Sequence, residues 1–188
     1  MRRKGFTLIE LLIVVAIIAI LAAIAVPNFL EAQTRAKVTR VRTDFRSIIG
    51  AMEAYHVDND DYPPDDQGTS WYNDFIPMTY LTTPIPYLSS VLTNPFFDIR
   101  QSRAPSGNTG AGNYAYWRRD AGVADPALQL FWHVISCGPN LTSELGRLDI
   151  QAWKVVERHP DFMNKLYDPT NGTVSYGDLH CTNRGITF

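Results

Sequence analysis

Residues 5–10 read Gly-Phe-Thr-Leu-Ile-Glu, and this stretch decides how the rest of the chain is interpreted. The basic residues 2–4 (Arg-Arg-Lys) precede it, and residues 11–26 follow it without a single polar side chain. As an α-helix, residues 6–26 would be about 30 Å long, which is the thickness of the hydrocarbon core of a bilayer. We therefore predict a transmembrane helix over residues 6–26.

Glu10 is the only charged side chain inside this apolar segment. A charge at the bilayer centre costs about 3 kcal/mol even on the mildest scales, so an ionisable residue there is a functional candidate that needs a partner. A buried ammonium group is one of the few partners that would compensate a carboxylate in lipid. Glu10 is therefore the first candidate site residue.

Residues 2–11, Arg-Arg-Lys-Gly-Phe-Thr-Leu-Ile-Glu-Leu, resemble the leader and cleavage site of type IV prepilins and type II secretion pseudopilins. The resemblance implies that a prepilin peptidase removes residues 1–5 by cutting between Gly5 and Phe6 on the cytoplasmic face. It implies that the same enzyme then methylates the new amine of Phe6. It also implies that Glu10 meets the Phe6 amine of a neighbouring subunit during assembly.

Two other interpretations of the N-terminus account for fewer of its features. A Sec signal peptide also has a basic start and an apolar core, but that core is usually about 7–15 residues long. Residues 22–25 (Ala-Ala-Ile-Ala) could mimic its cleavage site, yet the length of the apolar run and the acid at its head argue against removal. A plain signal anchor would leave Glu10 unexplained.

The length and charge of the chain limit its architecture and its partners. The 188 residues suffice for one membrane helix and one modest head domain. The net charge is −2, and loss of three basic leader residues would make it −2 − 3 = −5, which argues against nucleic acid as a partner. By the positive-inside rule, we expect a single-pass inner-membrane protein with a cytoplasmic N-terminus and a periplasmic C-terminal domain.

Helical periodicity continues beyond Pro27. Apolar residues recur there at steps of three and four, the pattern of an amphipathic helix, at Val38, Val41, Phe45, Ile48, Ile49, Met52 and Tyr55. We predict one helix over residues 6–57, with a kink at Pro27, where the ring removes a hydrogen bond and crowds the preceding turn.

The second half of this helix carries a cluster of basic side chains. They are Arg35, Lys37, Arg40, Arg42 and Arg46. Such a cluster can contact acidic surfaces of neighbouring subunits or anionic lipid head groups, or it can be a solvated helix face. The sequence leaves these interpretations open.

Residues 58–188 are predicted to form the globular head. Residues 67–113 are rich in proline, glycine and aromatic residues, and we interpret them as a loop-rich insertion between the helix and a sheet. Short helical turns are expected within residues 74–81 or 87–93. The role of this insertion is open.

The best strand candidates follow the insertion. Residues 114–117 alternate in character, and residues 128–135 form a compact apolar and aromatic run that ends at a Gly-Pro turn. The turn after this run and the C-terminal residues 167–179 are also similar to pseudopilins. The resemblance implies the α+β pilin-like fold, in which a long N-terminal helix packs on a small antiparallel sheet.

The C-terminal region is where major pseudopilins typically hold a structural calcium ion. Calcium takes six to eight oxygen ligands, several of them from backbone carbonyls. Asp168, Ser175 and Asp178, with carbonyls of residues 136–140, could supply them, or the two aspartates could instead cap turns. No other cofactor is expected.

Cys137 and Cys181 are the only cysteines, and both are expected on the oxidising side of the membrane. Pilins often carry a disulfide in their C-terminal region, whereas the major pseudopilins generally do not. A Cys137–Cys181 disulfide and two free thiols are therefore both open.

Catalytic motifs of the hydrolase and metalloprotease classes do not occur in the sequence. We expect a non-enzymatic protein that forms a homo-oligomer in a helical filament. The partners that the resemblance implies are the prepilin peptidase, the inner-membrane assembly platform and minor pseudopilins or pilins.

Three functions remain open from the sequence. The first is a subunit of the periplasmic pseudopilus of a type II secretion system, and the second is a type IV pilin for adhesion, motility or DNA uptake. The third, from another class, is a membrane-anchored periplasmic binding or carbohydrate-recognition module. Its surface would be the aromatic residues of the insertion and the strand after it, Trp71, Tyr72 and Trp117.

Overall fold

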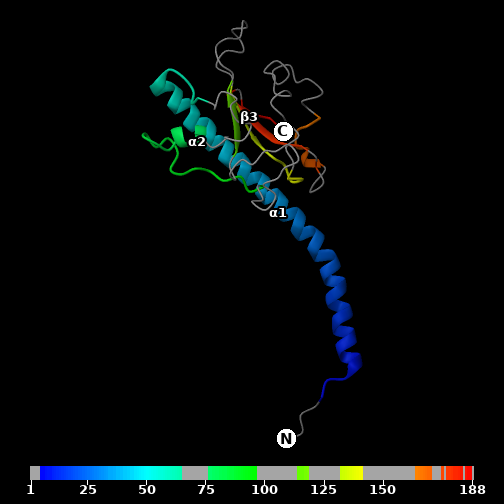
Figure 1. Cartoon of the computed structure of the whole chain (residues 1–188). Coiled ribbons are helices and arrows are strands. Elements are labelled where there is room, and N and C mark those ends of the chain that lie inside the picture. The colour runs from blue at the N-terminus through cyan, green and yellow to red at the C-terminus, as the bar shows by residue number, and fades with distance from the viewer. Residues whose placement is uncertain are drawn as a thin grey trace.

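The computed structural model shows a long helix, α1, whose C-terminal half packs against a small antiparallel sheet (Figure 1). The N-terminal half of this helix projects away from the head. The α+β class with a long N-terminal helix is thereby confirmed. The structure describes residues 5–64, 76–96, 114–118, 132–141, 164–170, 175, 177–183 and 185–187.

Helix α1 extends from Leu8 to Asn59, close to the range predicted from the sequence. It begins directly after its N-cap residue Thr7, and it ends where Asp60 adopts a left-handed backbone conformation with φ 56°. The N–H of Asp60 still donates to the carbonyl of His56 at 2.8 Å. Two prolines follow shortly afterwards, and they cannot continue a helix.

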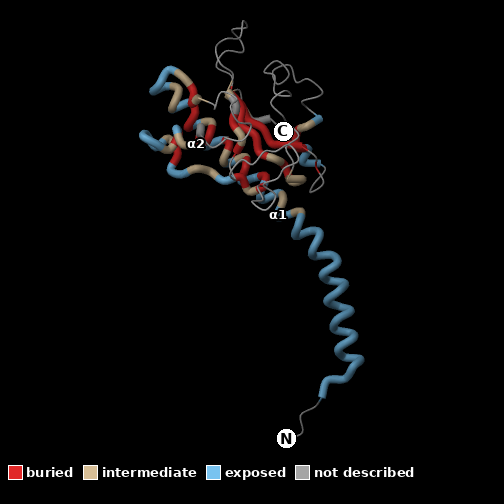
Figure 2. The backbone as a smooth tube through the Cα atoms, in the orientation of Figure 1, coloured by how far each residue is buried: buried red, intermediate tan, exposed pale blue. Residues whose placement is uncertain are grey.

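Burial divides α1 into two halves (Figure 2). Every residue from 5 to 30 is exposed, including all of the large aliphatic side chains. From residue 38 onward one stripe of the helix is buried, at Val38, Val41, Phe45, Ile48, Ala51 and Met52. The amphipathic half therefore holds the head, and the wholly apolar half makes no contact with it.

Pro27 lies inside α1, and the helix is unbroken on both sides of it. Figure 1 shows the helix curving over its N-terminal half. Proline removes one hydrogen bond and crowds the preceding turn, so it favours a bend there. The assignment of a kink to Pro27 itself stays a prediction.

The described part of the head contains a four-stranded antiparallel sheet in the order β1-β2-β3-β4. The strands are β1 (Ala115–Arg118), β2 (Trp132–Ser136), β3 (Leu179–Thr182) and β4 (Gly185–Thr187). The first two coincide with the strands predicted over residues 114–117 and 128–135, although residues 128–131 lie outside the described part.

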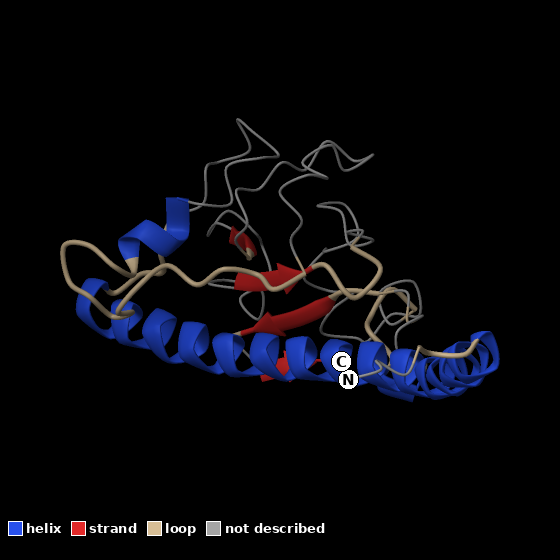
Figure 3. Ribbon diagram, turned by 90° about the horizontal axis from the view of Figure 1, so that it is seen from below, coloured by secondary structure: helices blue, strands red, loops and turns tan. Residues whose placement is uncertain are grey.

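Both faces of the sheet are buried. One face belongs to the same core cluster as the buried stripe of α1 and contributes Tyr116, Trp132, Val134, Leu179 and Cys181. The alternate residues of β2 and β3 lie on the other face and are buried as well, namely His133, Ile135, His180 and Thr182. Helix α1 thus covers one face of the sheet (Figure 3).

Two tyrosines, one directly before β1 and one within it, bond to α1 and to the segment that follows α1. The hydroxyl of Tyr114 donates to the Asp44 carboxylate at 2.5 Å, and the ring of Tyr114 packs on Phe45. The hydroxyl of Tyr116 donates to the carbonyl of Pro63 at 2.8 Å. Burial and the neighbouring Asp44 carboxylate raise the pKa of Tyr114, so its hydroxyl stays protonated and keeps donating.

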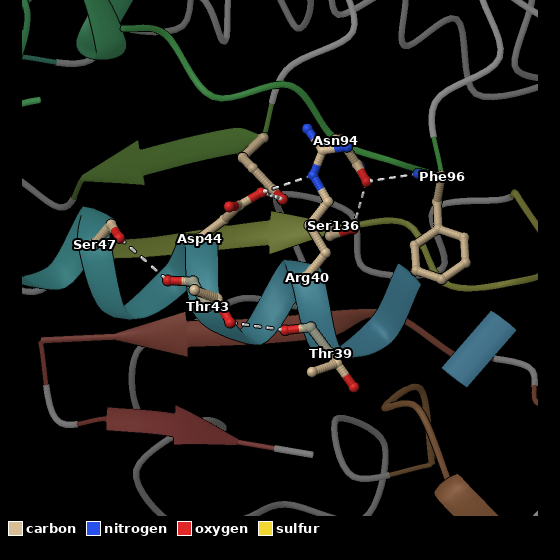
Figure 4. A network of polar contacts seen from close by, with 9 residues as sticks. Thr39, Arg40, Thr43, Asp44, Ser47, Asn94, Phe96 and Ser136 are labelled. Atoms are coloured by element: carbon tan, nitrogen blue, oxygen red, sulfur yellow. Dashed lines mark hydrogen bonds and ion pairs between the residues drawn. The ribbon is translucent and has the colours of Figure 1, made fainter. Parts of the chain in front are cut away.

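A short helix, α2 (Ile76–Tyr80), lies where a helical turn was predicted. The chain then continues to Asn94, which is buried against the end of β2. The Asn94 side-chain oxygen accepts from the Ser136 hydroxyl at 2.9 Å and from the Phe96 N–H at 3.0 Å (Figure 4). These bonds fasten the described part of the insertion to the sheet.

The other segment considered for a helical turn, residues 87–93, does not form one, because these residues form bends and a β-bridge position. The N–H of Tyr87 donates to the carbonyl of Ile85 at 3.0 Å, and that of Leu88 donates to Leu81 at 2.8 Å. These backbone donors bond to residues before the segment and not within a helix. Residues 1–4, Trp71 and Tyr72 lie outside the described part, as do residues 97–113 of the insertion.

His133 on β2 and His180 on β3 lie next to each other on the sheet face away from α1, with ring centroids 5.6 Å apart. Burial lowers the pKa of His133 well below its ordinary value, and the positive charge that His180 would carry when protonated lowers it further. Burial also lowers the pKa of His180, to about 3. Both imidazoles are therefore neutral in the folded protein near neutral pH.

Acid should consequently destabilise the head. The unfolded chain protonates each imidazole near pH 6.5, whereas the folded chain does not, so the free energy of unfolding should fall as the pH drops from 7 to 5. The expected loss is about 2 kcal/mol for each histidine. Denaturant titrations of the full chain in detergent measure it, with His180→Gln as the comparison. An equally steep pH dependence in that variant would contradict the assignment.

Candidate functional site

The candidate site lies at the start of α1, where Thr7 and Glu10 bond to each other in both directions. The backbone N–H and the hydroxyl of Thr7 each donate to Glu10 Oε2 at 2.8 Å. The N–H of Glu10 is directed at the Thr7 hydroxyl oxygen at 3.3 Å. This is a capping box, which satisfies backbone donors that the first helical turn would otherwise leave without partners.

The Thr7 contact is a functional feature that the sequence reasoning missed. Its signal was present, because a threonine followed three residues later by glutamate, directly before an apolar run, is the pattern of a capping box. The contact gives the Glu10 carboxylate two donors within its own chain. A charged side chain at this position is therefore compensated in part before any second subunit arrives.

The predicted cleavage junction lies just before the helix. Gly5 and Phe6 are exposed and not helical, and Phe6 is 72% exposed. An added Cβ atom at Gly5 would meet no atom within 4 Å. The junction is therefore accessible to an enzyme. Cleavage after Gly5 and methylation of Phe6 stay predictions.

The helix that follows is suited to a membrane by length and composition. Among the described residues, α1 is the only helix long and apolar enough to cross a bilayer, and none of its most apolar window is buried inside the protein. Exposed aliphatic side chains surround the helix on all sides between Leu8 and Leu30. A soluble protein rarely exposes an apolar surface of this extent, and the length and composition of the segment are those of a membrane-spanning helix.

The residues predicted for a calcium site lie in one region of the head. The N–H of Asp168 donates to the Ser175 hydroxyl oxygen at 2.8 Å. Asp178 is fully buried, and its backbone bonds to Lys165 and Tyr167 at 2.8 and 3.0 Å.

The turn predicted to supply carbonyl ligands approaches the same region. An added Cβ atom on Gly138 would lie 1.9 Å from the carbonyl oxygen of Gly177, so that only glycine fits there.

Few side-chain oxygens in this described region are available as calcium ligands. One oxygen of Asp168 accepts from the N–H and the hydroxyl of Thr170, and these bonds lower the pKa of the Asp168 carboxyl. The described residues contain no cluster of three or more acidic, histidine or cysteine side chains that could hold a metal ion. Most ligands of a calcium ion would therefore have to be carbonyl oxygens, and calcium binding stays a prediction.

The structure shows no disulfide between Cys137 and Cys181. Cys181 pairs with Val134 across β2 and β3, and Cys137 lies three residues beyond Val134. That offset is about 10 Å along a strand and places the two side chains on opposite faces. The Cα atoms in a disulfide are usually only about 4.4–6.8 Å apart.

The N-terminus matches a known sequence family. Residues 1–26 match the family model for the prokaryotic N-terminal methylation motif. The chain carries a prepilin-type N-terminus. No solved structure matches the chain.

Curated relatives are similar to about a third of the chain. It is 49% identical over 61 residues to the type IV major pilin protein PilA of Myxococcus xanthus, covering 32% of this chain and 28% of that protein. It is 54% identical over 59 residues to the type IV wide pilus major component PilA4 of Thermus thermophilus, covering 31% and 45%. It is 43% identical over 67 residues to the type II secretion system core protein G of Pseudomonas aeruginosa, covering 36% and 47%.

Each of these matches covers less than half the length of the relative. The prepilin-type segment is thus related to type IV pilins and to core protein G alike. The match to the methylation motif, over residues 1–26, includes the cleavage junction and Glu10. The similarity to these relatives does not distinguish between the two systems.

Replacement of Thr7 should loosen the start of α1. Thr7→Val removes the hydroxyl bonds to Glu10 but keeps the shape of the side chain, and loss of an N-cap costs about 1 kcal/mol. Hydrogen exchange of the amides of residues 8–10, measured in detergent micelles, should become about fivefold faster. Thr7→Ser keeps the hydroxyl and is the matched control. Unchanged exchange in the valine variant would mean that the cap does not hold the helix start.

Proposed function

We propose that this chain is a structural, non-enzymatic subunit of the periplasmic pseudopilus of a type II secretion system. The observation that carries the proposal is the prepilin-type N-terminus on a helix whose first half is apolar and exposed on all sides. Such a surface needs lipid in the single subunit and other helices in an assembly. The similarity to core protein G extends over 67 residues, compared with 61 and 59 residues for the two pilins.

In this proposal the basic leader holds the N-terminus in the cytoplasm, and α1 crosses the inner membrane once. The prepilin peptidase removes residues 1–5 and methylates Phe6. The head, residues 58–188, then lies in the periplasm. The amphipathic half of α1 connects the two regions rigidly, because its buried stripe is part of the core of the head.

Assembly would exchange the partners of Glu10. In the single subunit the carboxylate accepts from Thr7, at 2.8 Å for both donors. In the filament it would accept from the Phe6 amine of a neighbour, which is a full positive charge and so a stronger partner in a medium of low dielectric constant. The inner-membrane assembly platform and minor pseudopilins are the proposed partners in this step.

A type IV pilin is the second candidate function. It is supported by the 54% identity to the major component of the wide pilus of Thermus thermophilus. The same N-terminal chemistry would serve such a filament, because α1 supplies the core of the assembly in either case. A pilin and a pseudopilus subunit would differ in the head and in the host-cell machinery that assembles the filament.

Deletion of the gene separates these functions. A pseudopilus subunit is required for secretion, so exoproteins should accumulate in the periplasm, as measured by activity in fractionated cells. Normal secretion with loss of surface attachment or twitching would favour the pilin. Normal behaviour in both assays, with loss only of binding to a soluble ligand, would favour an anchored binding module and contradict a filament role.

Glu10 should be required for assembly but not for membrane insertion. Glu10→Gln keeps the shape and the hydrogen bonds to Thr7 but removes the charge that would pair with an amine. It should be inserted and cleaved normally, as checked by intact mass, and its yield in sheared and pelleted filaments should fall at least about tenfold. Glu10→Leu, which is more favourable in lipid, should fail equally. Normal incorporation of both variants would exclude the amine contact.

A further inference from the structure

The first basic side chains beyond the membrane half of α1 lie close to the expected membrane surface. Exposed apolar side chains continue to Phe29 and Leu30, which are 63% and 51% exposed. Arg35 and Lys37 follow five and seven residues after Leu30, so their Cα atoms lie about 8 and 11 Å further along the axis. The head groups add about 5–8 Å to each side of the hydrocarbon core. Both residues therefore begin just above the head-group level.

The side chain of Arg35 extends from there toward the membrane. Its Nη2 atom lies 2.5 Å from Oε1 of Glu31, which is one helical turn nearer to the membrane half. This direction is the ordinary one, because the Cα–Cβ bonds of an α-helix are tilted toward its N-terminus. Arginine and lysine near the ends of membrane helices bring their charged groups to the lipid head groups in the same way.

The pair with Glu31 does not prevent Arg35 from binding a phosphate. The two side chains are 71% and 43% exposed, and an exposed pair of this kind contributes little to stability. The bond to Glu31 is made through Nη2, and a guanidinium has five N–H donors in all. Arg35 can therefore bind Glu31 and a phosphate oxygen together, or exchange one for the other at little cost.

Lys37 is held beside the head by an aromatic ring. Its Nζ atom lies 5.7 Å from the centroid of the Phe96 ring. The N–H of Phe96 donates to Asn94, which also accepts from Ser136 at the end of β2, so the ring is fixed to the sheet. In Figure 4 the ring lies beyond Thr39, in the direction of the membrane half of α1. Lys37 itself is exposed, and its ammonium group can donate to a phosphate while it contacts the ring.

The helical turns next to the membrane carry a net positive charge. Residues 27–42 contain four basic side chains and one acidic side chain, a net charge of +3. Attraction between a basic side chain and an anionic lipid surface falls off within a Debye length, which is about 8 Å at physiological ionic strength. Arg35 and Lys37 lie within that distance of the head groups, whereas Arg46 lies about 16 Å further along the axis than Arg35.

We propose that Arg35 and Lys37 bind the phosphate groups of anionic phospholipids in the leaflet next to the head. This contact would fix the depth of the single subunit in the bilayer, with the head standing directly on the membrane surface. The inference rests on the proposed function, because it requires α1 to span the membrane. It goes beyond that function, because it assigns a lipid ligand to residues that take no part in the contact between Glu10 and the Phe6 amine.

Energy transfer to labelled lipids tests the contact in the full-length chain. A donor is attached at Ala36→Cys, which is exposed, in a Cys137→Ser background in which Cys181 is buried. The protein is reconstituted in nanodiscs of phosphatidylcholine and phosphatidylglycerol, and the acceptor is placed on the acyl chain of one or the other lipid. About 45 Å of helix separates Ala36 from the basic leader, so a short-range pair reports on the leaflet next to the head.

Transfer to phosphatidylglycerol should exceed transfer to phosphatidylcholine about threefold at low salt. This ratio should approach one at about 1 M salt, where the Debye length is about 3 Å. Arg35→Gln with Lys37→Gln should bring it close to one, whereas Arg35→Lys should keep it near wild type. The matched comparison is Arg35→Gln with Arg46→Gln. Eleven residues are close to three turns, so both changes remove an arginine from the same side of α1. Only the first should lower the ratio, by about twofold.

Three results would overturn the inference alone. They are a wild-type ratio near one, an equal fall in Arg46→Gln, and loss of the preference on addition of inorganic phosphate at constant ionic strength. The last would mean that these residues bind free phosphate and not a lipid surface. A chain that does not insert into the nanodiscs would overturn the membrane-spanning helix, and the proposed function with it.

Discussion

A carboxylate at the head of an apolar helix is the constraint on which the whole chain depends. Glu10 cannot lie in lipid without donors, and the nearest ones are the N–H and hydroxyl of Thr7, both at 2.8 Å. The cap that satisfies Glu10 also fixes the first residue of α1. Glu10 therefore contributes to the cap that starts the helix. Its carboxylate is partly compensated in lipid and can still bind a stronger cationic partner. The rest of α1 continues the geometry that this cap begins.

The continuity of α1 connects the membrane to the head. Residues 5–30 are exposed throughout, whereas the stripe from Val38 to Met52 is buried in the core. Because one helix carries both surfaces, an axial shift of the membrane half moves the head equally. The bonds of Tyr114 to Asp44 and of Tyr116 to Pro63 make the sheet part of the same body. Contacts between heads can therefore set the axial register of the helices, and contacts between helices can set the positions of the heads.

Local patterns predicted α1, α2, β1 and β2 but not β3 and β4, and contacts between distant residues could not be predicted. Apolar periodicity located α1 to within two residues at each end, because that signal lies in neighbouring residues. The sequence left open whether Cys137 and Cys181 pair, because the answer depends on strand register: Cys181 lies opposite Val134, and a shift of three residues moves Cys137 to the other face. The close approach of His133 and His180 has the same origin. At the candidate site, Glu10 was identified from its charge within an apolar segment. Its bonds to Thr7 became visible only in the geometry of the helix cap.

The contact proposed for assembly sets an axial displacement of the neighbouring chain. A neighbour whose Phe6 amine reaches Glu10 is displaced by about one turn, or roughly 6 Å, along the axis. The amine and the carboxylate are different groups of one chain, so each subunit can offer its amine to one neighbour and accept the amine of another. Such a heterologous contact that does not close produces an open filament, whereas a closed dimer would use each group only once. The amine contact would act within the bilayer, where salt screens a pair of charges much less than at an exposed surface.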